Sequence, residues 1–281
     1  MFKYTKYEFL GTYKFLMGAI GLIIVASTAI QMFFKNQYNF ANGSPGSIEA
    51  FQIMPFVMLA ATFTFIGAFI AVAVYLISSF RKELYEDRGY LTFALPMTGS
   101  QLLGSKLIIA LFWSVVMGIV VLVYNMVLAR FVFGPEWYNL MLDVIKQAEG
   151  LGKIIVSYSL ISVIETVVTL LLVYFTITIS RVSIKSKKIG GFWFVLFLIL
   201  SSFFSYIQSS IADSVPLYLD ITKMEFLSQN RLYFDNMNPE SMMNLANAGV
   251  ISISGLGFQI ILTVGLFLGT AYMLEKKIDL V

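Results

Sequence analysis

The sequence contains neither cysteine nor histidine in its 281 residues. Without cysteine, the chain forms no disulfide and offers no thiolate to a metal ion. Without histidine, it lacks the commonest metal ligand and the usual general base of enzymes. A nucleophilic centre of the Ser-His or Cys-His kind is therefore excluded.

Charge is also scarce in this chain. Asp, Glu, Lys and Arg together make up 12% of it, whereas a soluble domain carries about 25%. Hydrophobic residues make up 58%, and the mean hydropathy is +0.82. A soluble core has no room for so much apolar side chain, so the surrounding solvent must be lipid. The composition predicts an all-α polytopic membrane protein.

Six apolar stretches are long enough to cross a bilayer, which takes roughly 20 helical residues. They lie at about 15–34, 51–80, 102–133, 153–180, 190–212 and 249–274. The second, third and fourth are longer than a perpendicular span requires, so we expect them to tilt or protrude. The first lacks an A-x-A-like cleavage site and is expected to be a retained anchor. We predict one transmembrane domain over residues 1–281.

The distribution of Lys and Arg predicts the orientation. If the N-terminus is cytoplasmic, 13 of the 19 basic residues fall in inner segments and 6 on the outer side. An excess of inner positive charge is the usual arrangement, so both termini are expected in the cytoplasm. The inner connections, 81–101 and 181–189, are too short to contain a nucleotide-binding domain.

The first inner connection carries the most informative pattern. It begins with charged residues and ends at Pro96, which would terminate a short helix. Leucines lie on one face of this helix, and two aromatic residues and an acid lie roughly opposite: Leu84, Leu91 and Leu95 against Tyr85, Glu86 and Phe93. Such a helix either presents its second face to a partner or is an ordinary interfacial connection.

This stretch resembles a known family. It contains Glu86-Asp-Arg-Gly89, then Leu91-Thr-Phe-Ala-Leu-Pro96, and then Ser105-Lys106 leading into a hydrophobic helix. In the ABC-2 type permeases, the membrane subunits of ATP-binding cassette exporters, the loop between the second and third spans carries an acidic residue, a glycine, a leucine-proline pair and a later lysine. The six-span topology extends the resemblance over essentially the whole chain.

The resemblance implies a permease subunit in a bacterial cytoplasmic membrane. It would work as a homo- or heterodimer with two copies of a separate ABC ATP-binding subunit, which hold the ATP and magnesium. The inner loop would be a cytoplasmic coupling helix seated in a cleft of the ATPase. Four residues match the family pattern, and two are added from the helical wheel: Glu86, Gly89, Leu95 and Pro96, with Tyr85 and Phe93.

The first fourteen residues are similar to the interfacial elbow helix that precedes the first span in that family. Aromatic and lysine side chains suit a membrane interface, although Lys3, Lys6 and Lys14 would have to snorkel. The alternative is a short frayed leader.

The chain carries no ATP site of its own. The pattern G-x-x-x-x-G-K-[ST] does not occur, because Gly104-Ser-Lys106 has serine and lysine in the wrong order. We therefore expect no enzyme activity, no cofactor and no nucleic-acid partner for this chain.

Glu165 is the one acidic residue well inside a predicted span. It belongs to a polar stripe at helical spacing: Tyr158, Ser162, Glu165, Thr169 and Thr176, with Thr166 beside them. A carboxylate at that depth usually faces a bundle interior or a water-filled path. We name Glu165, Ser162 and Thr169 as candidate substrate-path residues, and helix-to-helix hydrogen bonding is the alternative.

Two shorter patterns are weaker. Ser201, Ser205 and Gln208 form a stripe on the fifth span, typical of helix packing or of a substrate-facing surface. Gly265-x-x-x-Gly269 in the last span is a small-residue packing motif, which favours close approach within one subunit over a dimer seam.

Function is then expected in one of a few classes. The first is an ATP-driven exporter of a hydrophobic or amphipathic substrate such as a peptide, similar to bacterial exporters of toxin and antimicrobial peptides. The alternative is a gradient-driven secondary transporter or channel that uses Glu165. An intramembrane enzyme would need paired acids or a Ser-Lys dyad, which the sequence does not offer. A sensor or immunity protein is a further possibility.

Overall fold

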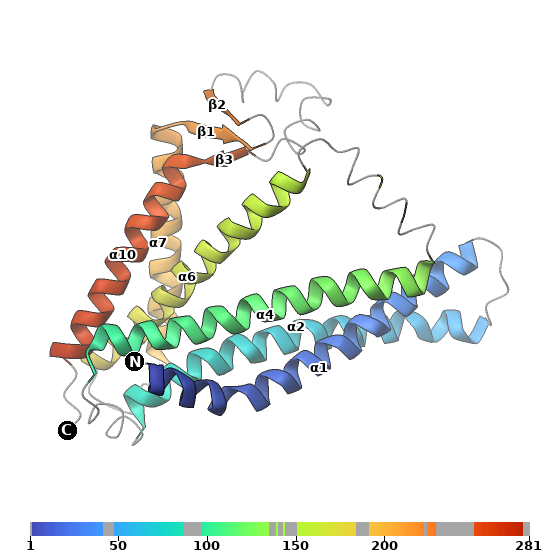
Figure 1. The fold of residues 1–281 in the computed structure, drawn as a ribbon, viewed down its shortest axis with the longest axis horizontal. Coiled ribbons are helices and arrows are strands. Elements are labelled where there is room, and N and C mark those ends of the chain that lie inside the picture. The colour runs from blue at the N-terminus through green and yellow to red at the C-terminus, as the bar shows by residue number, and fades with distance from the viewer. Residues whose placement is uncertain are drawn as a thin grey trace. The chain divides into compact units, whose positions relative to one another are not determined.

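Six long helices make up most of the computed structural model. The structure describes residues 2–41, 48–86, 97–134, 139, 143, 151–183, 191–221, 224–228 and 250–277. The helices are α1 (Phe2–Ala41), α2 (Ile48–Tyr85), α4 (Gly99–Phe133), α6 (Leu151–Ser183), α7 (Phe192–Ser214) and α10 (Ile253–Lys276) (Figure 1). All six are long and apolar enough to span a membrane.

The chain divides into two compact units. The first contains residues 1–79 and 108–144, and the second contains residues 80–107 and 145–281. Helices α2 and α4 each contribute residues to both units. The segment between them, which carries the predicted coupling motif, belongs to the second unit with α6, α7 and α10.

Helix α1 packs on α2 and α4 within the first unit. Buried apolar residues recur at helical spacing on each of the three helices: Leu16, Ile20 and Ile23 on α1, Ala61, Ala68 and Val72 on α2, and Ile109, Trp113 and Met117 on α4. The Phe15 and Tyr75 rings stack with centroids 4.2 Å apart. Tyr75 Oη donates to Gly11 O at 3.3 Å, and Ser79 Oγ donates to Glu8 Oε1 at 2.5 Å.

The second unit contains α6, α7 and α10, with α10 packed on both of the others. A three-stranded antiparallel sheet in the order β2-β1-β3 lies where α7 ends and α10 begins (Figure 1). Its strands are β1 (Leu217–Asp220), β2 (Glu225–Ser228) and β3 (Val250–Ser252). Asp220 pairs with both Glu225 and Val250, which joins the three strands.

Capping residues fix the start of two helices. Thr98 Oγ1 accepts from Gln101 N at 3.3 Å, while Thr98 N donates to Gln101 Oε1 at 3.4 Å. This reciprocal pair is a capping box, and it determines where α4 begins. Ser252 Oγ accepts from Gly255 N at 3.2 Å and caps α10 in the same way.

Apolar side chains cover the outer surface of these helices. Phe63 is 67% exposed, Phe131 79% and Ile261 72%, each in the middle or end of a long helix. Soluble monomers seldom present apolar surface on this scale, whereas a lipid-facing helix does. The six helices and their apolar surface confirm a helical multi-pass membrane protein.

The observed helices extend beyond the predicted spans, and the structure also contains a sheet. Each helix contains its predicted apolar stretch, except that the fifth and sixth begin a few residues later, at Phe192 and Ile253. Residues 2–14 form the first part of α1 and not an element of their own. The sheet was not predicted, because strands of three and four residues leave no periodic signal.

Candidate functional site

A buried ion pair joins the end of α2 to the first part of α4. Lys106 Nζ lies 2.7 Å from Glu83 Oε1, and the two side chains are 4% and 9% exposed. The lysine of the family-like motif is therefore paired with an acid three residues before Glu86. We call residues 80–86 and 98–107, on either side of this connection, the loop base.

Aromatic contacts join the loop base to α6. The Phe80 and Tyr174 rings stack with centroids 4.3 Å apart, and both residues are fully buried. Arg181 lies over the Tyr85 ring, with its Cζ 5.3 Å from the centroid, and Arg81 approaches the same ring at 5.8 Å. Each such cation–π contact contributes about 0.5–2 kcal/mol. The end of α2 is thereby held against the end of α6.

Gly99 brings the start of α4 against α10. A Cβ built on Gly99 would lie 2.6 Å from the backbone oxygen of Ala271 and 3.1 Å from Leu274 Cβ. Only glycine allows this approach, since any side chain would force the two helices apart. The loop base therefore contacts α6 on one side and α10 on another.

Two of the six predicted coupling residues lie in the described part of the chain. Glu86 follows α2 and is exposed, with its N–H donating to Lys82 O at 3.0 Å. Tyr85 is half-buried and faces the two arginines, so part of its ring is already used inside the subunit. Gly89, Phe93, Leu95 and Pro96 lie outside the described residues.

The second candidate site is a cleft of about 440 Å³ in the second unit. We call it the Glu165 cleft. Helices α6, α7 and α10 line it together with β3, through Tyr158, Ile161, Glu165, Ser205, Gln208, Ser209, Ala212, Val250, Ile251, Ser252, Gly255, Leu256 and Gln259. Two members of each polar stripe recognised in the sequence thus meet in this cleft: Tyr158 and Glu165 from the fourth span, and Ser205 and Gln208 from the fifth.

Within the cleft, the carboxyl group of Glu165 is exposed and has no hydrogen-bond or ion-pair partner among the described residues. Ser162 and Thr169, predicted beside it, do not line the cleft. Ser162 Oγ instead donates to Ser159 O at 2.8 Å, which satisfies the hydroxyl within α6. Of the three residues predicted to line a substrate path, Glu165 lines the cleft and the other two do not.

Gln259 of α10 is a cleft residue that sequence reasoning missed. It is 7% exposed, and its Nε2 donates to Gln208 Oε1 at 3.4 Å. Its own Oε1 is buried and has no hydrogen-bond partner in the described chain. The sequence signal for this residue is a single glutamine near the start of an apolar span. A buried amide needs a hydrogen-bond partner, so such a residue indicates a polar contact.

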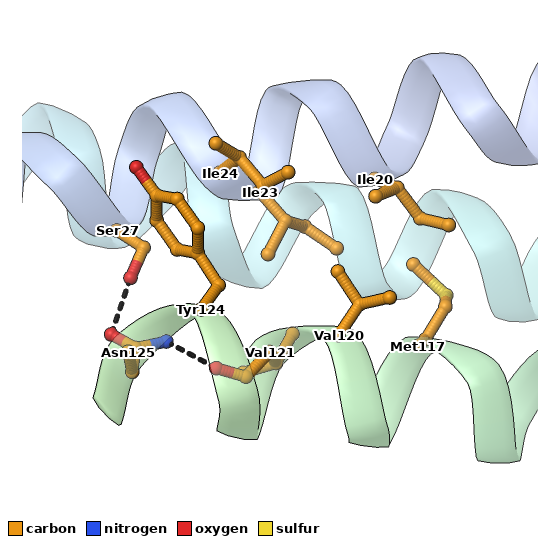
Figure 2. Close-up of a pocket in the computed structure, with 9 residues that line it drawn as sticks. All are labelled: Ile20, Ile23, Ile24, Ser27, Met117, Val120, Val121, Tyr124 and Asn125. Atoms are coloured by element: carbon orange, nitrogen blue, oxygen red, sulfur yellow. Dashed lines mark hydrogen bonds between the residues drawn. The ribbon is translucent and has the colours of Figure 1, made fainter. Parts of the chain in front are cut away.

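A polar cluster in the first unit was also missed. Figure 2 shows Asn125 of α4 bonded to Ser27 of α1. Both residues line a small cavity of about 10 Å³. Ser27 Oγ and Gln31 Nε2 both donate to Asn125 Oδ1, at 2.5 and 2.8 Å. The cavity holds about one water molecule at most. The cluster therefore joins two helices and does not form a ligand site.

Gly269 of the small-residue motif lies close to α6. A Cβ there would come within 3.2 Å of Phe175 Cε2, whereas one on Gly265 would meet nothing within 4 Å. Close approach within one subunit thus accounts for Gly269. No group of three acidic side chains that could hold a metal ion occurs among the residues described.

The fold and these sites define a multi-pass transmembrane protein with a cleft that contains a carboxylate. No family model, no curated protein and no solved structure matches the chain. The likeness to ABC-2 type permeases therefore depends on the motif and topology of this sequence, and enters below as a proposal.

Proposed function

We propose that the chain is the membrane-spanning permease subunit of an ATP-driven ABC exporter in a bacterial cytoplasmic membrane. The observation that carries the proposal is the motif at 86–106, set in a connection whose base is locked by the buried Glu83–Lys106 pair. Two ATP-binding subunits, a second permease copy or homologue, cytoplasmic termini and an interfacial role for residues 1–14 belong to the same proposal.

The loop base has the rigidity that mechanical coupling needs. A coupling element must move the helices to which it is attached, and loose attachment would dissipate the motion. The ion pair joins α2 to α4, the Arg181–Tyr85 contact joins α2 to α6, and Gly99 seats α4 on α10. A push on the exposed Glu86 would therefore reach three further helices.

The loop base and the Glu165 cleft belong to the same compact unit. Helix α6 contacts the loop base through Arg181 and lines the cleft with Glu165, sixteen residues away. That separation corresponds to about 24 Å along a helix, at 1.5 Å per residue. Closure of two ATPase subunits on the loop would thus move the helix that lines the cleft, which supports a path that opens and closes with ATP.

Co-purification tests the proposal. The chain is co-expressed with the ATP-binding protein encoded beside it and purified through a tag on the permease. We expect the ATPase to co-purify with the wild type, and Glu86→Ala and Phe93→Ala to reduce both association and ATP hydrolysis severalfold. Glu225→Ala, in the exposed strand β2, is the matched control and should change neither.

A permease that purifies alone and supports no ATP hydrolysis would contradict the proposal. The second candidate is a gradient-driven transporter or channel. It is favoured by one observation: the Glu165 carboxylate lies in an apolar helix and has no partner among the residues that the structure describes. It predicts uptake that follows an imposed proton gradient, needs no ATPase and is lost in Glu165→Gln.

A further inference from the structure

We infer that the Glu165 cleft binds an amphipathic molecule through a primary ammonium group. The chemistry of the ligand follows from the cleft itself. Only its identification as an exported peptide rests on the proposed function. Four properties of the cleft lead to it, which are its charge, its unsatisfied acceptor, its mixed lining and its size.

The charge of the cleft selects a cation. Glu165 is the one charged side chain among the described residues that line it, and no lysine or arginine is among them. A cation in the cleft would pair with this carboxylate, which has no partner among the described residues. An anionic ligand would add a second negative charge and is excluded by the same reasoning.

The second property is an acceptor that lacks a donor. Gln259 Nε2 donates to Gln208 Oε1, and Gln259 Oε1 has no hydrogen-bond partner within the part of the chain that the structure describes. Gln259 is more than nine-tenths buried and lines the cleft. An ammonium group has three N–H donors and no acceptor, so it can serve a carboxylate and a carboxamide oxygen together.

The remaining lining distinguishes among cations. A bound calcium ion would require six to eight oxygen ligands, and the cleft offers one carboxylate. Ile161, Ile251 and Leu256 add apolar surface beside the polar groups. A volume of about 440 Å³ falls in the range of small-molecule sites. The fitting ligand is thus an organic ammonium with an apolar body, such as a lysine side chain within an amphipathic peptide or a long-chain amine.

Direct binding tests the inference without the ATPase. The full chain is placed in phosphatidylcholine nanodiscs, and a fluorescent amphipathic peptide of leucine and lysine is titrated in, with empty nanodiscs as background. We expect saturable binding that dodecylammonium displaces and dodecyl sulfate does not. Dodecyltrimethylammonium, which carries the charge without N–H donors, should compete more weakly than dodecylammonium.

Variants then assign the binding to the cleft. Glu165→Gln should weaken it by about tenfold or more, the loss expected when one partner of a desolvated charge pair is removed. Glu165→Asp should retain most of the affinity, and Glu225→Gln outside the cleft should retain all of it. Thermal unfolding shows whether Glu165→Gln folds. If it does not, Gln259→Leu tests the inference in its place, and we expect it to weaken peptide binding.

Unchanged affinity in Glu165→Gln, or in Gln259→Leu where that variant decides, would overturn the inference. So would equal competition by dodecyl sulfate and dodecylammonium. Dodecylammonium binding through Glu165 without peptide binding would support the ammonium site and contradict a peptide as its source. Because Glu165→Gln should leave ATPase co-purification intact, a failure here is distinguishable from a failure of the proposed function.

Discussion

At the scale of single residues, the Glu83–Lys106 pair shows how polar groups are accommodated in an apolar bundle. Two opposite charges are buried 2.7 Å apart, so their attraction offsets part of the cost of burying each of them. We predict that Lys106→Met destabilises the protein by about 3–5 kcal/mol, because it leaves the Glu83 carboxylate buried without its cation. Thermal unfolding in detergent measures the loss.

The double variant Glu83→Gln with Lys106→Met is the control for that experiment. It removes both charges, and it should recover a large part of the stability that the single variant loses. If single and double variants are equally unstable, packing and not charge accounts for the effect.

Asn125 allows a second prediction at this scale. Its side chain accepts from Ser27 (Figure 2) and from Gln31, so Asn125→Leu removes the acceptor of two hydrogen bonds from α1. Hydrogen bonds between membrane helices contribute about 0.6 kcal/mol on average and up to about 1.7. We expect a loss of about 1–2 kcal/mol in thermal unfolding. Tyr124→Phe, which removes one bond to Thr28, should cost less, and a larger cost would contradict this order.

At the scale of helices, Gly99 determines how closely α4 approaches α10. Gly99→Ala places a Cβ 2.6 Å from the backbone oxygen of Ala271, which cannot rotate away. We predict a destabilisation of about 1–3 kcal/mol, the usual cost of overpacking, and weaker coupling of ATP hydrolysis to transport. Gly265→Ala meets nothing within 4 Å and should be neutral or slightly stabilising. Equal effects of the two substitutions would contradict this assignment.

The helices are also where sequence and structure can be compared most directly. Apolar length predicted all six, because a membrane sets the minimum span. The polar stripes through Glu165 and through Ser205 and Gln208 were visible too, since helical spacing puts their members on one face. That the two faces meet was not predictable, because the periodicity of one helix does not identify its neighbour.

The features that were missed share a physical cause. Gln259 and Asn125 are isolated polar residues whose partners lie on another helix, far away in the sequence. Lys106 was noted only as part of a motif, and its partner Glu83 lies outside the matched residues. Strand β3 pairs with β1 across about thirty residues, and pairing at such distance is not encoded locally.

At the scale of the whole molecule, the exposed Glu86, the loop base with its buried ion pair and the Glu165 cleft lie within one compact unit. We propose that ATP hydrolysis on partner subunits moves a substrate through this chain. That claim concerns net movement across a bilayer, so binding and co-purification test it only in part.

The most direct test is transport by the complex of the chain with its ATP-binding subunit, reconstituted into inside-out proteoliposomes with a labelled lysine-containing amphipathic peptide outside. We predict that ATP, and not a non-hydrolysable analogue, drives accumulation of the peptide, and that Glu86→Ala and Glu165→Gln each reduce it severalfold. Accumulation that ignores ATP and follows an imposed proton gradient would contradict the claim and identify a gradient-driven transporter.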